Sequence, residues 1–145
     1  LFFFFFFPKV CYLLEVDHKR GMKNWKIYNG ANFVLVISGM AVFFAFSYEI
    51  VSYFNPTNRY VLSRLLEVAV FIPILLAISI PLKQLILAYN YKRFYVSLTS
   101  IMVIFNLLAI VLLLPYYQVY GVFYSLIATD LIIIIFYLYR LKNKL

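Results

Sequence analysis

The sequence predicts an all-α fold, a polytopic bundle of transmembrane helices. Of its 145 residues, 66% are hydrophobic, 21% are aromatic and only 12% are charged, whereas about 25% of the residues in an ordinary soluble domain are charged. The mean hydropathy is +0.96, which leaves too few polar side chains to cover a surface in water. The charged residues stand in short clusters between long apolar runs. Together these observations exclude most water-soluble folds.

The length of the apolar runs predicts the individual spans, because a helix needs about 20 apolar residues to cross the hydrocarbon core. The run over 94–129 contains no charge but is too long for one crossing. Pro115, followed by Tyr116 and Tyr117, is expected to break it into a helical hairpin. The expected spans are a partial one at about 1–14 and four complete ones at about 31–54, 65–91, 94–114 and 119–139.

The charge of the connecting segments predicts the orientation. Thirteen basic residues against five acidic ones give a net charge of +8, and nine of the basic residues fall in the segment before the first complete span, in the 92–93 turn and in the C-terminal tail. Only Arg59 and Arg64 fall on the other side. Basic loops favour the cytoplasmic face, so we expect a multi-pass protein of the cytoplasmic (inner) membrane with a cytoplasmic C-terminus, and no nucleic-acid partner. Residues 17–26 are expected to form a short amphipathic stretch resting on that leaflet.

The two ends of the sequence and its single cysteine add little chemistry. The chain begins inside an apolar run without an initiator Met, and it lacks the charged start and small-residue cleavage site of a signal peptide. We therefore expect the C-terminal part of a longer polytopic protein. Cys11 has no second cysteine with which to form an intramolecular disulfide.

Two ionisable residues inside the expected spans are the main candidates for a function, because charges within a membrane are costly. Asp130 lies near the middle of 119–139, and Lys83 lies inside 65–91 toward its cytoplasmic end. Either residue can line an aqueous cavity, and the alternatives are a helix-pairing carboxylate and a lysine that extends to the interface. Glu49 and Glu67 lie near the external interface, where a carboxylate reaches water cheaply.

Neutral polar residues and prolines complete the candidates. Gln84 and Asn106 are expected to pair helices, since amides within a membrane more often bind another helix than a substrate. Pro73 and Pro81 are expected to act as hinges or kinks in one helix, and Pro115 is expected to do so in the next. Such interrupted helices are common in transporters, although a static kink explains them equally well.

No enzyme signature is present in the sequence. His18 is the only histidine, and the four glycines form no phosphate-binding loop. No serine or cysteine stands in a known nucleophile motif. We expect neither catalysis, nor a metal site, nor a cofactor.

The sequence from Pro73 to Tyr139 resembles the C-terminal region of bacterial polysaccharide flippases. The resemblance rests on a proline-bearing helix that ends in Gln84 and Leu85, a short basic turn, a helix with a mid-span Asn106, and a Leu-Pro exit at Pro115. Tyr-Gly at 120–121 and Ala-Thr at 128–129 follow in the last helix. The family comprises the Wzx-like O-antigen exporters of the multidrug, oligosaccharidyl-lipid and polysaccharide exporter superfamily.

The resemblance implies a two-lobed parent of which this chain is the distal part of the second lobe. Such a parent moves an undecaprenyl-diphosphate-linked oligosaccharide from the cytoplasmic to the outer face by alternating access. Mapped onto this sequence, only Lys83 is implied as a contact for the diphosphate, and Asp130 is implied as a coupling or pairing carboxylate. The remaining partners are the lipid bilayer and the rest of the same chain.

Two other functions stay open on the sequence alone. A multidrug or other exporter of the same fold is one, because aromatic faces attract cationic drugs. A small accessory membrane protein is the other, in which the polar residues only hold helices together.

Overall fold

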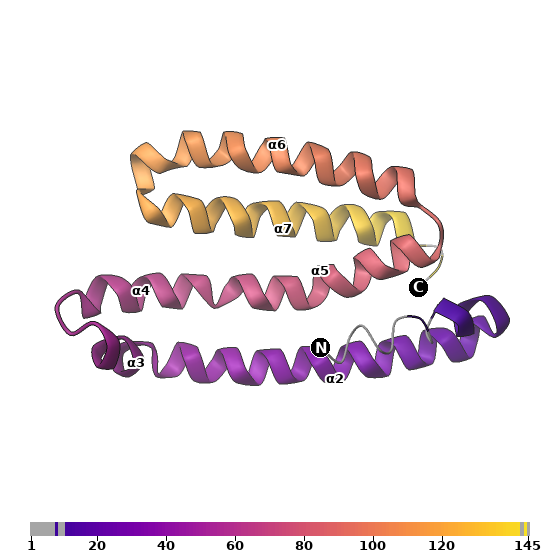
Figure 1. The fold of residues 1–145 in the computed structure, drawn as a ribbon, viewed down its shortest axis with the longest axis horizontal. Coiled ribbons are helices and arrows are strands. Elements are labelled where there is room, and N and C mark those ends of the chain that lie inside the picture. The colour runs from indigo at the N-terminus through magenta and orange to yellow at the C-terminus, as the bar shows by residue number, and fades with distance from the viewer. Residues whose placement is uncertain (1–7, 9–10, 143, 145) are drawn as a thin grey trace.

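The chain is almost entirely helical in the computed structural model, which describes residues 8, 11–142 and 144 (Figure 1). No strand occurs in this described part, so the predicted all-α fold is confirmed. Residues 11–16 form a short helical segment before the main helices. The helices that follow are α2 (His18–Ala45), α3 (Ser47–Phe54), α4 (Arg59–Ala69), α5 (Phe71–Ala88), α6 (Lys92–Tyr117) and α7 (Val119–Leu141).

Four helical stretches are long and apolar enough to cross a membrane. They are α2, the combined α4–α5 stretch from Arg59 to Ala88, α6 and α7. The chain is therefore a multi-pass membrane protein with four candidate spans in its described part. The expected partial span at 1–14 lies largely outside the described residues.

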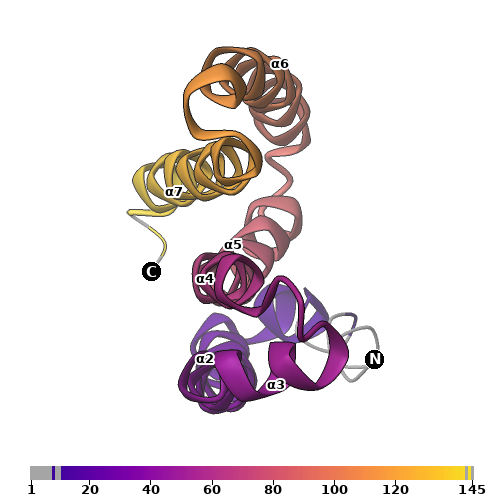
Figure 2. The ribbon, with the colours of Figure 1, turned by 90° about the vertical axis from the view of Figure 1, so that its left-hand side faces the viewer.

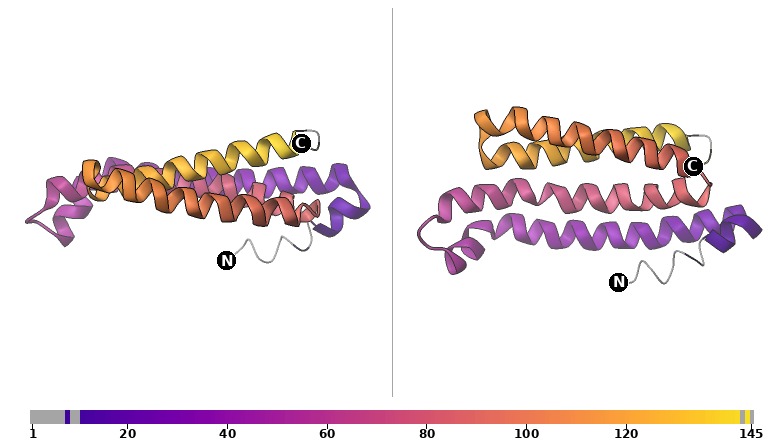
Figure 3. Two further views of the ribbon diagram at one scale, coloured as in Figure 1. Left: turned by 90° about the horizontal axis from the view of Figure 1, so that it is seen from above. Right: turned by 45° about the horizontal axis from the view of Figure 1, so that its top comes forward.

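The spans form an open row in the spatial order α2, α5, α7, α6 (Figures 2 and 3). α5 packs against α2 on one side and α7 on the other, and α7 in turn packs against α6. The main apolar core lies near the C-terminal ends of α5 and α7, where Leu85, Ile86 and Leu141 are fully buried. α7 thus lies between α5 and α6 and packs against both of them.

Residues 18–26 of the predicted interfacial stretch form the first part of α2. Asp17 caps this helix, with its carboxylate accepting a hydrogen bond from the Arg20 backbone N–H at 3.1 Å. Helix formation then continues without interruption to Ala45, because lysine, arginine and methionine form helix well whatever their hydropathy. The helix that contains the first complete span therefore starts before the predicted span, which covered about 31–54, and it ends at Ala45, with Phe46 separating it from the short α3.

The two prolines predicted as hinges of one helix behave differently. The boundary between α4 and α5 falls at Val70, directly after Ala69. Ala69 is four residues before Pro73, and its carbonyl is the group that a proline at this position cannot bond and crowds. Pro81 is buried inside α5, which continues past it, and Figure 1 shows the last turns of α5 inclined toward the α6–α7 pair.

The predicted helical hairpin is present, but Pro115 does not end the first of its two helices. α6 runs through Pro115 to Tyr117, and the reversal occurs at Gln118, whose φ is 51° and ψ is −132°. Pro115 lies only two residues before the end of α6 at Tyr117, so the hydrogen bond that it removes and the carbonyl that it crowds belong to the last turns of the helix, which continues to Tyr117. The positive φ of Gln118 ends α6 and starts α7.

Gly121 lets α7 approach α6 directly after this reversal. A Cβ atom added at Gly121 would lie 2.9 Å from the carbonyl carbon and oxygen of Leu113. These are backbone atoms, which cannot move aside as a flexible side chain can. The close approach of the two helices therefore requires glycine at this position.

Replacing Gly121 with alanine is expected to destabilise the protein by about 1–3 kcal/mol, because the added methyl group must push the two backbones apart. Thermal unfolding in detergent checks this. Gly39→Ala is the matched control, since a Cβ atom there meets nothing within 4 Å, and alanine should leave the melting temperature unchanged or slightly higher. Equal melting temperatures for Gly121→Ala and wild type would contradict this account of the hairpin.

Candidate functional site

A polar cluster joins α6 and α7 near the middle of these two candidate spans. The Asn106 side-chain nitrogen donates to the Ser125 hydroxyl at 2.9 Å and to the Thr129 hydroxyl at 3.0 Å. In return the Ser125 hydroxyl donates to the Asn106 backbone carbonyl at 3.1 Å, and the Thr129 hydroxyl donates to the Ser125 carbonyl at 2.8 Å. The structure thus gives Asn106 interhelical bonds of the kind expected from the sequence, and Ser125 and Thr129 are the partners that sequence reasoning did not identify.

Asp130 follows this cluster directly and is half-buried in α7. It continues the stripe of Ile134, Tyr137 and Leu141, which is spaced by three and four residues and belongs to the core shared with α5. No hydrogen bond or ion pair to Asp130 occurs within residues 8, 11–142 and 144. A lone carboxylate near the bilayer centre costs about 2.5–3.5 kcal/mol on insertion scales, so Asp130 is the most expensive polar group of the four spans.

Lys83 lies near one end of α5 rather than in its middle. Its ammonium group lies over the ring of Tyr95 on α6, 5.0 Å from the ring centroid. Five residues separate it from Ala88, where α5 ends. Gln84, its neighbour, is half-buried and has no hydrogen bond to any residue that the structure describes, so the helix-pairing role expected of it has no partner here.

The two main candidates are not brought together. The only ion pair in the described part of the chain joins Arg64 to Glu67, at 3.1 Å, so Lys83 and Asp130 are not paired. Asp130 lies eleven residues before the end of α7. Since α5 and α7 run in the same direction and share a core at their ends, helical rise places Asp130 about 10 Å deeper than Lys83.

Tyr89 connects the end of α5 with the start of α2 and the C-terminal tail, at the end of the bundle where α5 and α7 finish. Its hydroxyl lies 2.7 Å from the His18 Nε2 atom and 3.7 Å from the Met22 sulfur, both on α2. The Lys144 ammonium lies 5.9 Å from the centroid of its ring. Burial, and to a lesser extent Tyr91, raises the pKa of Tyr89 above its usual value. Sequence reasoning missed this junction because its members are up to 71 residues apart.

Basic side chains collect at this same end, here called the basic end. It contains the start of α2, the turn between α5 and α6, and the C-terminal tail, and its aromatic rings hold some of the cations. Arg140 lies 4.4 Å from the centroid of Tyr91 and 5.8 Å from that of Phe94. The described basic residues of this end are His18, Lys19, Arg20, Lys23, Lys26, Lys92, Arg93, Arg140, Lys142 and Lys144.

The opposite end of the bundle, which contains α3 and the start of α4, has fewer charged residues, and their charges nearly cancel. Glu67 accepts hydrogen bonds from Ser47 at 3.4 Å and from Arg64 at 3.1 Å, and Arg59 lies 5.5 Å from the ring centroid of Tyr48. Glu67 therefore ties α3 to α4. Glu49 is exposed.

The chain matches no family model, no curated protein and no solved structure. Within the described residues no group of three histidine, cysteine or carboxylate side chains could hold a metal ion.

Replacing Asn106 with leucine is expected to lower the free energy of unfolding by about 1–2 kcal/mol, because the replacement removes both interhelical bonds and leaves two hydroxyls without their amide donor. Titration with SDS from a mild detergent measures it. Asn32→Leu is the control, since Asn32 is exposed on α2 and has no hydrogen bond to a described side chain. Equal stability of the two variants would show that the cluster does not hold α6 to α7.

Proposed function

We propose that the chain is part of an exporter that moves lipid-linked oligosaccharide repeat units across the cytoplasmic membrane during polysaccharide biosynthesis. The proposal starts from the resemblance of residues 73–139 to polysaccharide flippases. The single structural observation that carries it is Asp130, a half-buried carboxylate in the middle of a span without a partner in the described part. A residue so costly in lipid is retained where it meets water or a moving partner.

In this proposal the two ionisable residues act at different depths. Lys83 lies close to the basic end and is held by an aromatic face, so it is placed to attract the diphosphate of an undecaprenyl-diphosphate-linked oligosaccharide as it enters. Asp130 lies deeper and carries the coupling step, in which a cation or proton is bound and released. The basic end is then the cytoplasmic one, by the positive-inside bias.

A second candidate function follows from the Asn106 cluster. All of the hydrogen bonds of this cluster are made within it, which suits a structural membrane protein whose polar groups only hold helices together. In that case Asp130 is a packing residue, and its charge has no role in transport.

Removing the Asp130 carboxylate separates these two functions. In the full-length protein, Asp130→Asn is expected to lower surface polysaccharide about tenfold or more, because the amide cannot bind and release a proton. Lys83→Gln is expected to lower it less, since neighbouring cations remain. The measurement is complementation of a flippase-null strain, normalised to the protein present in the membrane.

Glu49→Gln is the matched control, because Glu49 is an exposed carboxylate outside the four spans and should leave export unchanged. Full export by both Asp130→Asn and Lys83→Gln would remove these residues from the mechanism. Loss of drug resistance with intact polysaccharide would favour a multidrug exporter instead.

The proposed orientation has its own test. In a Cys11→Ser background, Thr57→Cys should react with a membrane-impermeant maleimide on intact cells, because Thr57 is exposed in the turn at the end opposite the basic one. Lys142→Cys, on the tail, should react only after the membrane is permeabilised. The reverse pattern would place the basic end outside and invert the proposed direction of entry.

A further inference from the structure

We propose that the basic end carries a binding site for the phosphate headgroup of an anionic phospholipid in the membrane leaflet that surrounds it. The site is a pocket of about 470 Å³ between the start of α2 and the C-terminal tail. It is separate from Asp130 and Lys83, and it does not depend on what the protein transports. The pocket is lined by His18, Lys19, Met22, Lys23, Lys26, Ile27 and Lys144.

The pocket has the charge that a phosphate requires. Four of its lining residues are lysines, and none of them is paired with a carboxylate in the part of the chain that the structure describes, where Arg64–Glu67 is the only ion pair. The nearest acidic group in sequence, Asp17, already accepts the hydrogen bond that caps α2. The four lysines therefore leave the pocket with a net positive charge, which an anion that bridges two of them partly neutralises.

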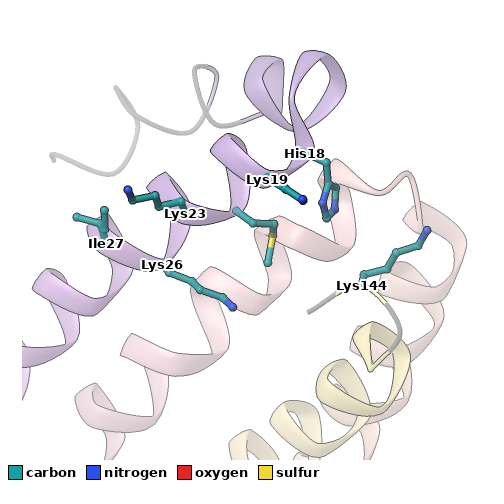
Figure 4. A pocket seen from close by; sticks show the side chains of 7 residues that line it. His18, Lys19, Lys23, Lys26, Ile27 and Lys144 are labelled. Carbon is teal, nitrogen blue, oxygen red and sulfur yellow. The ribbon is translucent and has the colours of Figure 1, made fainter.

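Its shape is set by the Tyr89 junction. Because Tyr89 contacts His18, Met22 and Lys144, the start of α2 and the tail are held on either side of the end of α5. Figure 4 shows Lys19 and Lys26 on the side of α2 that faces α5, while Lys23 and Ile27 lie on the outer side of α2 and the ammonium of Lys144, on the tail, points away from α2. Lys19 and Lys26 thus stand on the inner side of the pocket. The long, flexible stems of Lys23 and Lys144 let these two cations turn toward the same space when an anion binds.

The depth of the pocket selects a lipid as the ligand. The uncharged part of α2, residues 27–45, is about 28 Å long at about 1.5 Å per residue, which matches the hydrocarbon core of about 30 Å. Residues 18–26 of the same helix, which carry the lysines, therefore project into the headgroup layer. Ile27, at the lower rim of the pocket and 55% exposed, then meets the start of the acyl chains. A pocket with cations above and apolar side chains below fits an amphiphile with a phosphate headgroup better than it fits free phosphate.

The chain carries its own reporter for this site. Trp25 is the only tryptophan, it lies between Lys23 and Lys26 on α2, and it is partly buried against the core that contains Met22. Bromine quenches tryptophan fluorescence only at short range. Lipids brominated near the carbonyl end of an acyl chain therefore report which lipid occupies the neighbourhood of Trp25.

The test reconstitutes the purified chain in phosphatidylcholine vesicles and replaces part of that lipid with brominated phosphatidylglycerol or with brominated phosphatidylcholine. Wild type is expected to bind phosphatidylglycerol near Trp25 about fivefold more tightly than phosphatidylcholine. This factor corresponds to the effect of about one lysine at an anionic surface. The triple variant Lys19→Gln, Lys23→Gln and Lys26→Gln should lose this preference. The corresponding triple replacement by arginine, which keeps the charge, should retain it, and so should Arg59→Gln, which removes one cation at the opposite end.

Four outcomes would overturn the proposal. Wild type without a preference for phosphatidylglycerol would show that no anionic lipid binds here, and an unchanged preference in the triple glutamine variant would place the site elsewhere. A preference that millimolar inorganic phosphate abolishes, while chloride of equal ionic strength does not, would identify a soluble phosphate as the ligand. If the triple variant does not reconstitute, Lys26→Gln alone should give an intermediate preference, and a wild-type value there would equally overturn it.

Discussion

The position of α7 between α5 and α6 is the constraint on which the rest of the structure depends. In lipid, apolar surfaces gain little by meeting one another, so helices associate through close backbone contact and interhelical hydrogen bonds. α7 provides both toward α6, with Gly121 against Leu113 and with Ser125 and Thr129 against Asn106. Its other stripe, which ends at Leu141, shares a core with α5. One helix therefore holds two neighbours by two different kinds of contact.

At the other edge of the row, α2 is fixed at its ends rather than along its length. None of the residues in its most apolar stretch is buried inside the described structure, although α5 lies beside it. Its start is held by the Tyr89 junction, and residues 11–16 fold back against it at Gly21, where a Cβ atom would lie 2.7 Å from the Leu14 backbone nitrogen. At its far end, α3 and α4 contact it. An edge helix held in this way leaves a long apolar face for lipid or for further helices.

The features that the sequence could predict are those set by local chemistry. Hydropathy is enough to find the four spans, and an amide in mid-span is enough to single out Asn106. The start of α2 at His18 was not predicted, because the lysines lower the local hydropathy and so indicate the end of a span. The same lysines favour helix, so the helix continues beyond the apolar segment into the headgroup layer. The prediction that Pro115 ends its helix was wrong, because the effect of a proline depends on how close it lies to the helix end. The Tyr89 junction could not be predicted at all, since it joins residues far apart in the chain through packing that no local pattern records.

The separation of Lys83 from Asp130 limits the mechanisms that the bundle can support. A lysine and a carboxylate in contact would neutralise each other and leave the interior without a free charge. Here Lys83 rests on Tyr95, and its long stem lets the ammonium reach the interface, whereas the short side chain of Asp130 keeps its carboxylate at the depth of the span. The bundle therefore presents a cation near its basic end and a separate acidic group inside. Such an arrangement can attract an anion at the surface and respond to a cation or proton within, without either event cancelling the other.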